Sequence, residues 1–346
     1  MISLLLINYR SSILAVQAIR SARAATAGDL EVVVVDNSCD AAEAESLEGH
    51  ADTVLVAERN LGYAAGINRG RPACRGEVLV IANPDVVFGP RAIDELAAAL
   101  AASGAAVAGP ALSWDTRGEW MLPPADLVTA AEKLDEALSS RVSLWSAWRD
   151  RRRFRSRLRF WLLSETTAVR AISGAVMAIR AGIFDSLGGF DERFPLYFEE
   201  TDFLRRVAGR GGRIVYVPSA RCRHLFNQSA GGEPSRSASL FVESERRYLE
   251  KWSGVAMARL LKSIERPPRT LPPLELSGPV ELDSGDLVVE ASPLPSFTTA
   301  AGHFPASNAV TLPDEVWSTY RGDRLFLRVV DRHTGRVRGT YVRRRS

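Results

Sequence analysis

The sequence has few cysteines. Cys39, Cys74 and Cys222 are the only ones among 346 residues, and no two of them form a CxxC pair. This spacing excludes a disulfide framework and a cysteine-ligated zinc site, and it is typical of a protein that works in the reducing cytoplasm.

The chain also lacks a large excess of charge and a long apolar run. Its net charge of +3 is too small to indicate nucleic-acid binding. The longest weakly apolar stretch, residues 96–112, is mostly alanine and too short to predict a membrane span. At the N-terminus the first charge, Arg10, follows the apolar residues, which predicts a strand and not a signal peptide. We expect a soluble cytoplasmic protein, or one held peripherally at the inner face of a membrane.

Apolar strands alternate with helical patterns along residues 1–110. Strands are expected at residues 3–7, 31–36, 53–56, 77–82 and 105–108, and helices at 12–25, 63–71 and 92–101. This alternation predicts an α/β fold with a parallel sheet covered by helices.

Three of these strands end in polar residues, at Asn8, at Asp36-Asn37 and at Asn83-Pro84-Asp85. In open α/β sheets ligands bind beyond the carboxyl ends of the strands, so these side chains are expected to converge on one crevice. Each alone also fits an ordinary strand end or helix cap. A carboxylate such as Asp85, held beside a proline, can bind a divalent cation that neutralises a diphosphate, although the tripeptide is also an ordinary turn sequence.

The pattern breaks at residues 113–171, which we interpret as an insertion. Its residues 148–161 read WRDRRRFRSRLRFW, with seven arginines and one acid. On a helix, Phe154, Leu158, Trp161 and Leu162 form one apolar stripe. Such a helix suits an anionic membrane surface or the phosphates of a lipid-linked acceptor. The alternative is a solvated arginine face packed on the main domain.

The composition changes after residue 264. Residues 265–273 are proline-rich and predict a linker. Residues 274–346 carry short apolar runs between turn residues, which predict a small β-rich domain of undisclosed role with a disordered basic tail at 336–345. The predicted domains are therefore 1–264, which contains the 113–171 insertion, and 274–346.

An ordered set of motifs resembles an inverting family 2 glycosyltransferase of the GT-A fold, in particular its rhamnosyltransferases. The resemblance covers residues 1–252. The motifs are Asn8-Tyr9, Val35-Asp36-Asn37-Ser38, residues 60–70 (NLGYAAGINRG), Asn83-Pro84-Asp85, Ser173-Gly174-Ala175, Gly189-Phe190-Asp191-Glu192, Phe198-Glu199-Glu200-Thr201-Asp202 and His224. The fold it implies is a Rossmann-like mixed sheet with helices on both faces.

The resemblance implies transfer of a sugar, with rhamnose favoured, from a dTDP- or UDP-sugar to a hydroxyl of a glycan or lipid-linked glycan. Asp85 would ligate Mg²⁺ or Mn²⁺ at the donor diphosphate, and His224 would join the metal or the diphosphate. Asn83, which replaces the first carboxylate of the family triplet, would contact the nucleotide or a metal-bound water. Asp36 can accept a hydrogen bond from the N3–H of uracil or thymine. The other donor-binding candidates are Asn8, Asn60, Gly66, Asn68 and Gly174.

The stretch Glu199-Glu200-x-Asp202 matches the family's Glu-Asp-x-Asp, whose second residue is the catalytic base. Here that position is Glu200, which adds one methylene to the reach of the carboxylate. Asp202 lies about 200° around the helix from Glu200 and would pair with Arg205 or Arg206. The choice of base between Glu200 and Asp202 stays open.

Two other functions remain as alternatives. One is a catalytically silent protein that binds sugar nucleotides or glycans, suggested by the Glu200 departure and the C-terminal β-rich region. The other is a nucleotidyltransferase, which would need a glycine-rich loop after the first strand. Residues 8–12 contain no glycine.

Overall fold

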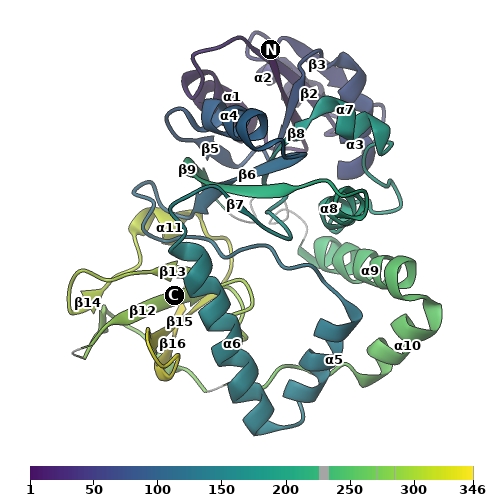
Figure 1. Cartoon of the computed structure of the whole chain (residues 1–346). Helices are drawn as coiled ribbons and strands as arrows, with labels where there is room; N and C mark the ends of the chain where they lie inside the picture. The colour runs from purple at the N-terminus through teal and green to yellow at the C-terminus, as the bar shows by residue number, and fades with distance from the viewer. Residues whose placement is uncertain (226–233, 271, 284, 346) are drawn as a thin grey trace. The chain divides into compact units, whose positions relative to one another are not determined.

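The computed structural model describes residues 1–225, 234–270, 272–283 and 285–345. The chain divides into two compact units (Figure 1). Unit 1 contains Met1–Leu112, Ala125–Leu127 and Ser164–Trp252, and unit 2 contains Ser113–Pro124, Val128–Leu163 and Ser253–Ser346. Within these ranges no helix combines the length and the apolarity that crossing a bilayer requires.

Unit 1 is built on a nine-stranded sheet in the order β3-β2-β1-β4-β8-β6-β9-β5, with β7 paired to β9. The strands are β1 (Ile2–Asn8), β2 (Leu30–Asp36), β3 (Thr53–Val56), β4 (Val78–Ala82), β5 (Val86–Phe88), β6 (Val107–Ser113), β7 (Thr167–Ala168), β8 (Val176–Arg180) and β9 (Ile214–His224). The helices are α1 (Ser12–Ala24), α2 (Ala41–Leu47), α3 (Tyr63–Gly70), the short 3₁₀ helix η1 (Arg71–Ala73), α4 (Ala92–Ser103), α7 (Ala181–Ser186), α8 (Glu199–Gly209) and α9 (Pro234–Ser253).

The sheet is mixed. β1 pairs in parallel with β2 and β4, whereas β8 runs antiparallel to β4. Helices α3, α7 and α8 cover one face, and α1 and α4 cover the other (Figure 1). The consecutive residues Val32, Val33, Val34 and Val35 have no exposed surface because both faces of their strand are covered. The predicted α/β class, a mixed sheet between two helical layers, is therefore confirmed.

Unit 2 combines a five-stranded sheet, in the order β10-β16-β15-β12-β13, with a two-stranded sheet of β11 and β14. The strands are β10 (Leu274–Glu275), β11 (Val280–Glu281), β12 (Leu287–Ser292), β13 (Ala301–His303), β14 (Ala309–Val310), β15 (Arg324–Asp331) and β16 (Val337–Arg344). The helices are α5 (Ala130–Ser139), α6 (Ser143–Trp161), α10 (Val255–Ile264) and α11 (Asp314–Thr319). The predicted β-rich C-terminal region is present.

The units differ from the predicted domains in where the insertion belongs. Phe154 and Trp161 of α6 pack with Val288 and Val330 of unit 2. The buried guanidinium of Arg157 lies 2.7 Å from a carboxylate oxygen of Glu290 on β12. Most of residues 113–171 and all of α10 therefore fold with the C-terminal strands, because the predicted apolar stripe of α6 completes their core.

The basic C-terminal tail also differs from the prediction. Residues 337–344 form β16, which pairs antiparallel with β15, and Val342 is buried. Val342 is the buried residue of this strand, and Arg338 and Arg344 are exposed. The expectation of disorder for this tail was wrong.

Candidate active site

Asp85 and His224 lie side by side at one edge of the sheet. Asp85 ends the turn between β4 and β5, and β5 pairs antiparallel with β9 so that Val86 is opposite His224. The amide of Leu225 donates to the carbonyl of Asp85 at 3.0 Å. These constraints bring the Asp85 Oδ1 and His224 Nε2 atoms to 3.3 Å, and both residues are buried.

This pair fits the donor set of a divalent cation. Two atoms bound at right angles to one Mg²⁺ or Mn²⁺ at about 2.1 Å are about 3 Å apart, close to the observed separation. No third histidine, cysteine, aspartate or glutamate of the described residues completes a metal-binding group with them. Asp85 and His224 would therefore leave most coordination positions for diphosphate oxygens and water.

Two further carboxyl groups begin α8. Glu199 is buried, with 5% of its surface exposed, and Glu200 is partly exposed. A Cβ atom on Gly174 would lie 2.7 Å from the Cγ atom of Glu200, so only glycine at position 174 leaves room for this side chain. The Glu200 Oε1 atom accepts a hydrogen bond from the Thr201 hydroxyl at 3.0 Å. The structure thus places Gly174 against Glu200.

The backbone just before these carboxyl groups is strained. Tyr197 and Phe198 have φ values of +66° and +68°, which cost roughly 1 kcal/mol or more for each residue that is not glycine. Aromatic packing holds them there, because both rings contact Phe241, at 5.5 and 5.4 Å, and Phe198 also contacts Tyr248. The turn aims the first residues of α8, and strain of this kind is common at functional sites.

Burial raises the pKa of both Glu199 and Glu200 above the ordinary value for glutamate, and the charge of Glu200 raises the pKa of Glu199 further. A hydrogen bond between the two carboxyl groups also raises the pKa of Glu199 and lowers that of Glu200. Glu199 therefore holds its proton to higher pH than Glu200. A carboxylate with a raised pKa is a stronger base, which suits general-base chemistry near neutral pH.

Glu199→Gln is expected to stabilise the protein at alkaline pH. The folded-state pKa of Glu199 lies above its unfolded value. The contribution of Glu199 to the free energy of unfolding is therefore fully present below pH 4.5 and is lost as the pH rises through the folded-state pKa. The loss is about 1.4 kcal/mol per unit of pKa shift. Glutamine keeps the hydrogen bond without the charge. Thermal melts of both proteins between pH 5 and pH 9 should diverge as the pH rises. Parallel melting curves across this range would contradict the buried-acid assignment.

Tyr63 was missed by the sequence analysis as a site residue. It is the first residue of α3, and its phenol has no hydrogen-bond partner among the described residues. Burial raises its pKa well above the ordinary value, and the charges of Glu199, Glu200 and Asp85 raise it further. The charges of these three carboxyl groups therefore act on the phenol. The sequence contained an indication of this role, because Tyr63 is the aromatic residue of the glycine-rich motif at residues 60–70.

Asp36 lies in a second polar group at the same edge of the sheet. In the parallel pair of β1 and β2 it is opposite Asn8, whose Nδ2 donates to the Asp36 Oδ1 at 2.8 Å. The amide of Ser38 donates to the same oxygen. The Asp36 Oδ2 atom is buried and has no hydrogen-bond partner within the described ranges. A buried carboxylate oxygen left in this state can accept a hydrogen bond from a ligand.

Asn37 links this group to Tyr63. Its side chain donates to the carbonyl of Gly62 at 3.0 Å, immediately before α3. The amide of Tyr63 in turn donates to the carbonyl of Pro195, in the segment that leads to α8. One hydrogen-bonded series thus connects the Asp36 region to the residues around Glu200.

Four predicted donor-binding residues have contacts within the chain. Asn8 uses its amide to orient Asp36 and to contact Ser38 and Glu43. The Asn60 side chain accepts a hydrogen bond from the amide of Gly62 and so closes the turn before α3. We therefore give Asn8 and Asn60 positioning roles.

The other two are Gly66 and Asn68, on α3. A Cβ atom on Gly66 would lie 2.9 Å from Ile7, so this glycine allows the helix to pack closely on the sheet. The Asn68 side chain both donates to the carbonyl and accepts from the amide of Phe190. Both residues thus have packing or hydrogen-bonding contacts within the fold.

Asp202 is fully buried and is engaged by three partners. Its Oδ2 atom accepts from Arg206 at 2.8 Å, as the helical spacing predicted, and its Oδ1 atom accepts from Trp252 at 2.9 Å and lies 2.6 Å from the Lys251 ammonium. These contacts tie α9 to α8. Of the two candidate bases, Glu200 is the one with surface exposed and with Gly174 beside it.

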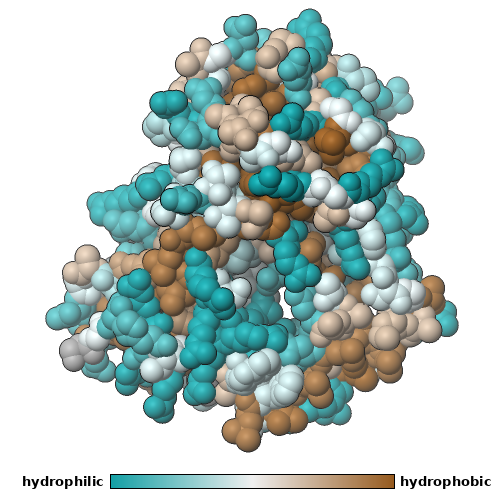
Figure 2. Space-filling model, viewed as in Figure 1, coloured by the Kyte–Doolittle hydropathy of each residue, from teal (hydrophilic) through white to brown (hydrophobic). Residues whose placement is uncertain are grey.

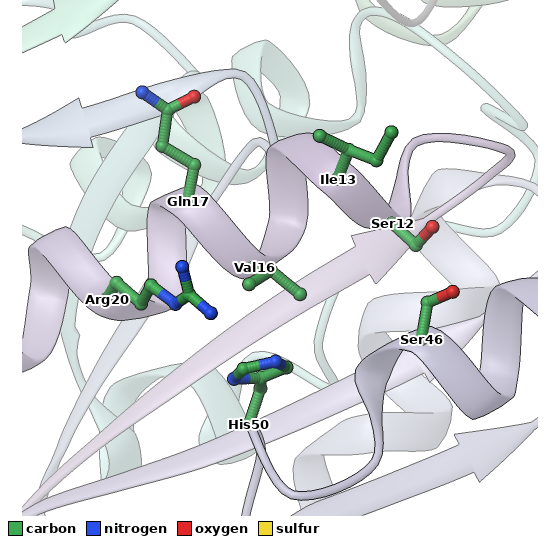
Figure 3. A pocket seen from close by; sticks show the side chains of 7 residues that line it. All are labelled: Ser12, Ile13, Val16, Gln17, Arg20, Ser46 and His50. Carbon is green, nitrogen blue, oxygen red and sulfur yellow. The ribbon is translucent and has the colours of Figure 1, made fainter.

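A surface pocket lies elsewhere in unit 1. Figure 3 shows it between the outer face of α1 and the end of α2, lined by Ser12, Ile13, Val16, Gln17, Arg20, Ser46 and His50. None of the predicted site residues lines it, so it is not a candidate for the donor site.

Comparison with known proteins points to one enzyme family. The family model described as glycosyltransferase like family 2 matches residues 2–247. The N-acetylglucosaminyl-diphospho-decaprenol L-rhamnosyltransferase of two Mycobacterium tuberculosis strains is 28% identical over 236 residues, which cover 61% of this chain and 71% of the relative.

Solved structures resemble the chain more distantly. GalNAc-T7 with UDP, GalNAc and Mn²⁺ is 16% identical with a TM-score of 0.46, over 65% of this chain and 43% of its own. The mannosyltransferase PcManGT of Pyrobaculum calidifontis with GDP-Man and Mn²⁺ is 14% identical with a TM-score of 0.45, over 76% and 74%. At this level of similarity the two complexes do not inform on the site of this chain.

Proposed function

The chain belongs to the family 2 glycosyltransferases and has their GT-A fold, and from this premise we propose that it transfers a sugar, with inversion, from a dTDP- or UDP-sugar to a hydroxyl of a lipid-linked glycan. The observation that carries the proposal is a grouping of side chains: Asp85 lies 3.3 Å from His224, and the amide of Asn83 in the same turn donates to the carbonyl of Ala175, next to the Gly174 that contacts Glu200.

The pyrimidine donor is supported by the buried, unpartnered Oδ2 atom of Asp36. Uracil and thymine carry an N3–H donor that this oxygen can accept, whereas adenine has no such donor. The rhamnose donor and the lipid-linked acceptor are supported by the relative's name, since that enzyme is a rhamnosyltransferase for a diphospho-decaprenol acceptor.

We propose that Asp85 and His224 hold Mg²⁺ or Mn²⁺ together with the donor diphosphate. When bound, the ion would stabilise the charge that develops on the departing nucleoside diphosphate. Asn83 lies in the same turn and would contact the nucleotide or a water on the ion. The 3.3 Å separation of the two ligand atoms supports this assignment.

In the proposed reaction the Glu200 carboxylate removes the proton of the acceptor hydroxyl as the oxygen attacks the anomeric carbon. The carbon–oxygen bond to the diphosphate breaks on the opposite face, which inverts the anomeric configuration. The Tyr63 phenol can donate a hydrogen bond into the same group of carboxylates. Positioning and charge stabilisation would supply most of the acceleration.

The function is tested by incubating the protein with dTDP-rhamnose and UDP-sugars, Mn²⁺ and a short-chain diphospholipid-linked N-acetylglucosamine. We expect transfer from one donor and a product of inverted configuration by NMR. Failure to release any nucleoside diphosphate would instead favour the silent sugar-nucleotide-binding alternative, and thermal shift with the same donors would detect that binding.

Asp36→Ala is expected to raise the KM for the donor by about 10- to 100-fold with a smaller effect on kcat. The reason is the loss of a charge-assisted hydrogen bond to the pyrimidine ring of the donor. Initial rates at varied donor concentration measure the change, with the exposed Asp29→Ala as the matched control. An unchanged KM for the donor would show that the pyrimidine ring does not bind at Asp36.

A further inference from the structure

Unit 2 exposes an unusual group of apolar side chains on α5, the start of α6 and α10. They are Leu134 and Leu138 on α5, Val142, Leu144, Trp145 and Trp148 at the start of α6, and Val255 and Leu260 on α10. Figure 2 shows apolar surface gathered over these helices. Leu144 has 83% of its surface exposed, and Trp145 and Trp148 are the exposed tryptophans of the described part of the chain.

These helices form one connected surface. Helix α5 packs against both α6 and α10. Arg141, between α5 and α6, donates to the carbonyls of Ala137 and of Ile264 at the end of α10. Asp135 on α5 accepts from the indole of Trp145 at 2.9 Å and from Arg149 at 2.8 Å. The exposed side chains are therefore held on a braced scaffold.

One face of α6 continues this apolar surface with arginines. In chain order the face carries Leu144, Trp145 and Trp148 and then Arg151, Arg152, Arg155 and Arg159. At about 100° per residue these side chains lie within an arc of about 120°. The opposite side carries Phe154, Arg157 and Trp161, which are buried in unit 2. Of the apolar stripe predicted from the sequence, Phe154 and Trp161 are thus internal, whereas Leu162 is half exposed, and a different face of the helix is turned outward.

Three arginines of this face are available to an anionic partner, whereas the fourth, Arg152, pairs with Asp135 at 2.6 Å. Within the described residues Arg151, Arg155 and Arg159 form no ion pair with a carboxylate. Arg152 lies over the Trp148 ring, with its guanidinium carbon 4.7 Å from the ring centroid. The surface therefore has indole rings and leucines at one end and a row of guanidinium groups next to them. This order matches the boundary between acyl chains and phosphate headgroups in a bilayer.

We propose that α5, α6 and α10 form a docking surface for an anionic phospholipid bilayer, with Trp145, Trp148 and Leu144 in the interface and the exposed α6 arginines on lipid phosphates. The apolar and aromatic content sets this surface apart from a merely solvated arginine face, because water alone does not stabilise exposed indoles and leucines. The surface is argued from unit 2 alone, and its link to catalysis rests on the proposed lipid-linked acceptor.

The test is flotation of the full chain with vesicles of phosphatidylcholine alone and with about one-third phosphatidylglycerol. We expect binding to the anionic vesicles that weakens at high salt. Arg155→Glu/Arg159→Glu should lower the partition coefficient by more than about tenfold, because each arginine near such a surface contributes about fivefold. Trp145→Ser/Trp148→Ser should also lower it.

Matched controls lie at exposed positions outside helices α5, α6 and α10. Arg20→Glu/Arg69→Glu makes the same charge change, and Ile13→Ser/Leu274→Ser removes two exposed apolar side chains, and both should bind vesicles like the unsubstituted chain. Equal binding to neutral and anionic vesicles, or surface variants that bind like the controls, would overturn the proposal. A concentration-dependent dimer that only the tryptophan variant abolishes would identify a second copy as the occupant and also overturn it.

A second readout separates this proposal from the proposed function. Transfer to a short-chain acceptor in solution should be equal in the surface variants and in the unsubstituted chain. Absence of transfer in a chain that still binds anionic vesicles would count against the proposed function and leave the docking surface standing.

Discussion

Glu200→Gln is expected to lower kcat by about 10²- to 10⁴-fold and to leave the KM for the donor nearly unchanged. Glutamine has almost the same shape but cannot take the proton of the acceptor hydroxyl, so the loss should equal the contribution of a general base. The packing against Gly174 and the hydrogen bond from Thr201 do not require a charge. Initial rates of transfer, together with donor affinity by calorimetry, measure the two effects separately.

The matched control is Glu45→Gln on the exposed surface of α2, which should keep full activity. In the unsubstituted enzyme the rate should fall as the pH drops through the raised pKa of Glu200, so this acidic limb should lie above pH 4.5. Transfer by Glu200→Gln at more than a tenth of the normal rate would show that another group is the base. Glu200→Asp introduces the aspartate of the Glu-Asp-x-Asp pattern. It then tests whether the length of the side chain limits the rate of transfer.

Asp85→Ala is expected to abolish metal-dependent transfer, with a loss of about 10³-fold or more in kcat/KM. The substitution removes the carboxylate that lies 3.3 Å from His224, and with it the negative ligand of the proposed ion. Binding of Mn²⁺ in the presence of UDP or dTDP, followed by electron paramagnetic resonance, should weaken in parallel. This second readout does not depend on turnover.

Asp29→Ala, in an exposed loop, is the control for loss of one negative charge and should behave like the unsubstituted enzyme in both measurements. Full activity of Asp85→Ala would refute the metal assignment. Loss of activity with unchanged Mn²⁺ binding would mean that Asp85 acts on the substrate directly and that the ion lies elsewhere.

The parts of this site that follow from strand geometry could be predicted from the sequence. A run such as Val32-Val33-Val34-Val35 is β-branched and apolar because its strand is covered on both faces, and it ends in Asp36. Parallel neighbours end at the same edge, so Asn8 is opposite Asp36, and the residues after β4 lie beside them. The convergence of polar strand ends was therefore predictable without any long-range information.

Other features depend on contacts that no local pattern carries. Burial of α6 in unit 2 depends on strands more than 100 residues later, so its apolar stripe could equally have predicted a membrane face. The three residues of β5 are too few to show a period, yet they bring His224 to Asp85. The left-handed Tyr197 and Phe198 are not residues that favour such a conformation, and tertiary packing alone holds them.

The roles assigned to asparagines were the least predictable. Asn8 and Asn68 each satisfy neighbouring groups in the folded chain, which a sequence motif cannot distinguish from contacts to a ligand. The role of Asp36 as an acceptor for the N3–H of a pyrimidine stays a prediction. The unpartnered oxygen of Asp36 is the observation that a sequence could not supply.

The central claim is that one site in unit 1 binds the nucleotide, the ion and the acceptor hydroxyl. Its most direct measurement is a crystal structure with Mn²⁺ and dTDP or UDP, in which the ion is located by anomalous scattering. We predict the anomalous peak in contact with Asp85 and His224 and the pyrimidine N3 on Asp36. A peak bound by other residues, or a nucleotide remote from Asp36 and Glu200, would contradict the account.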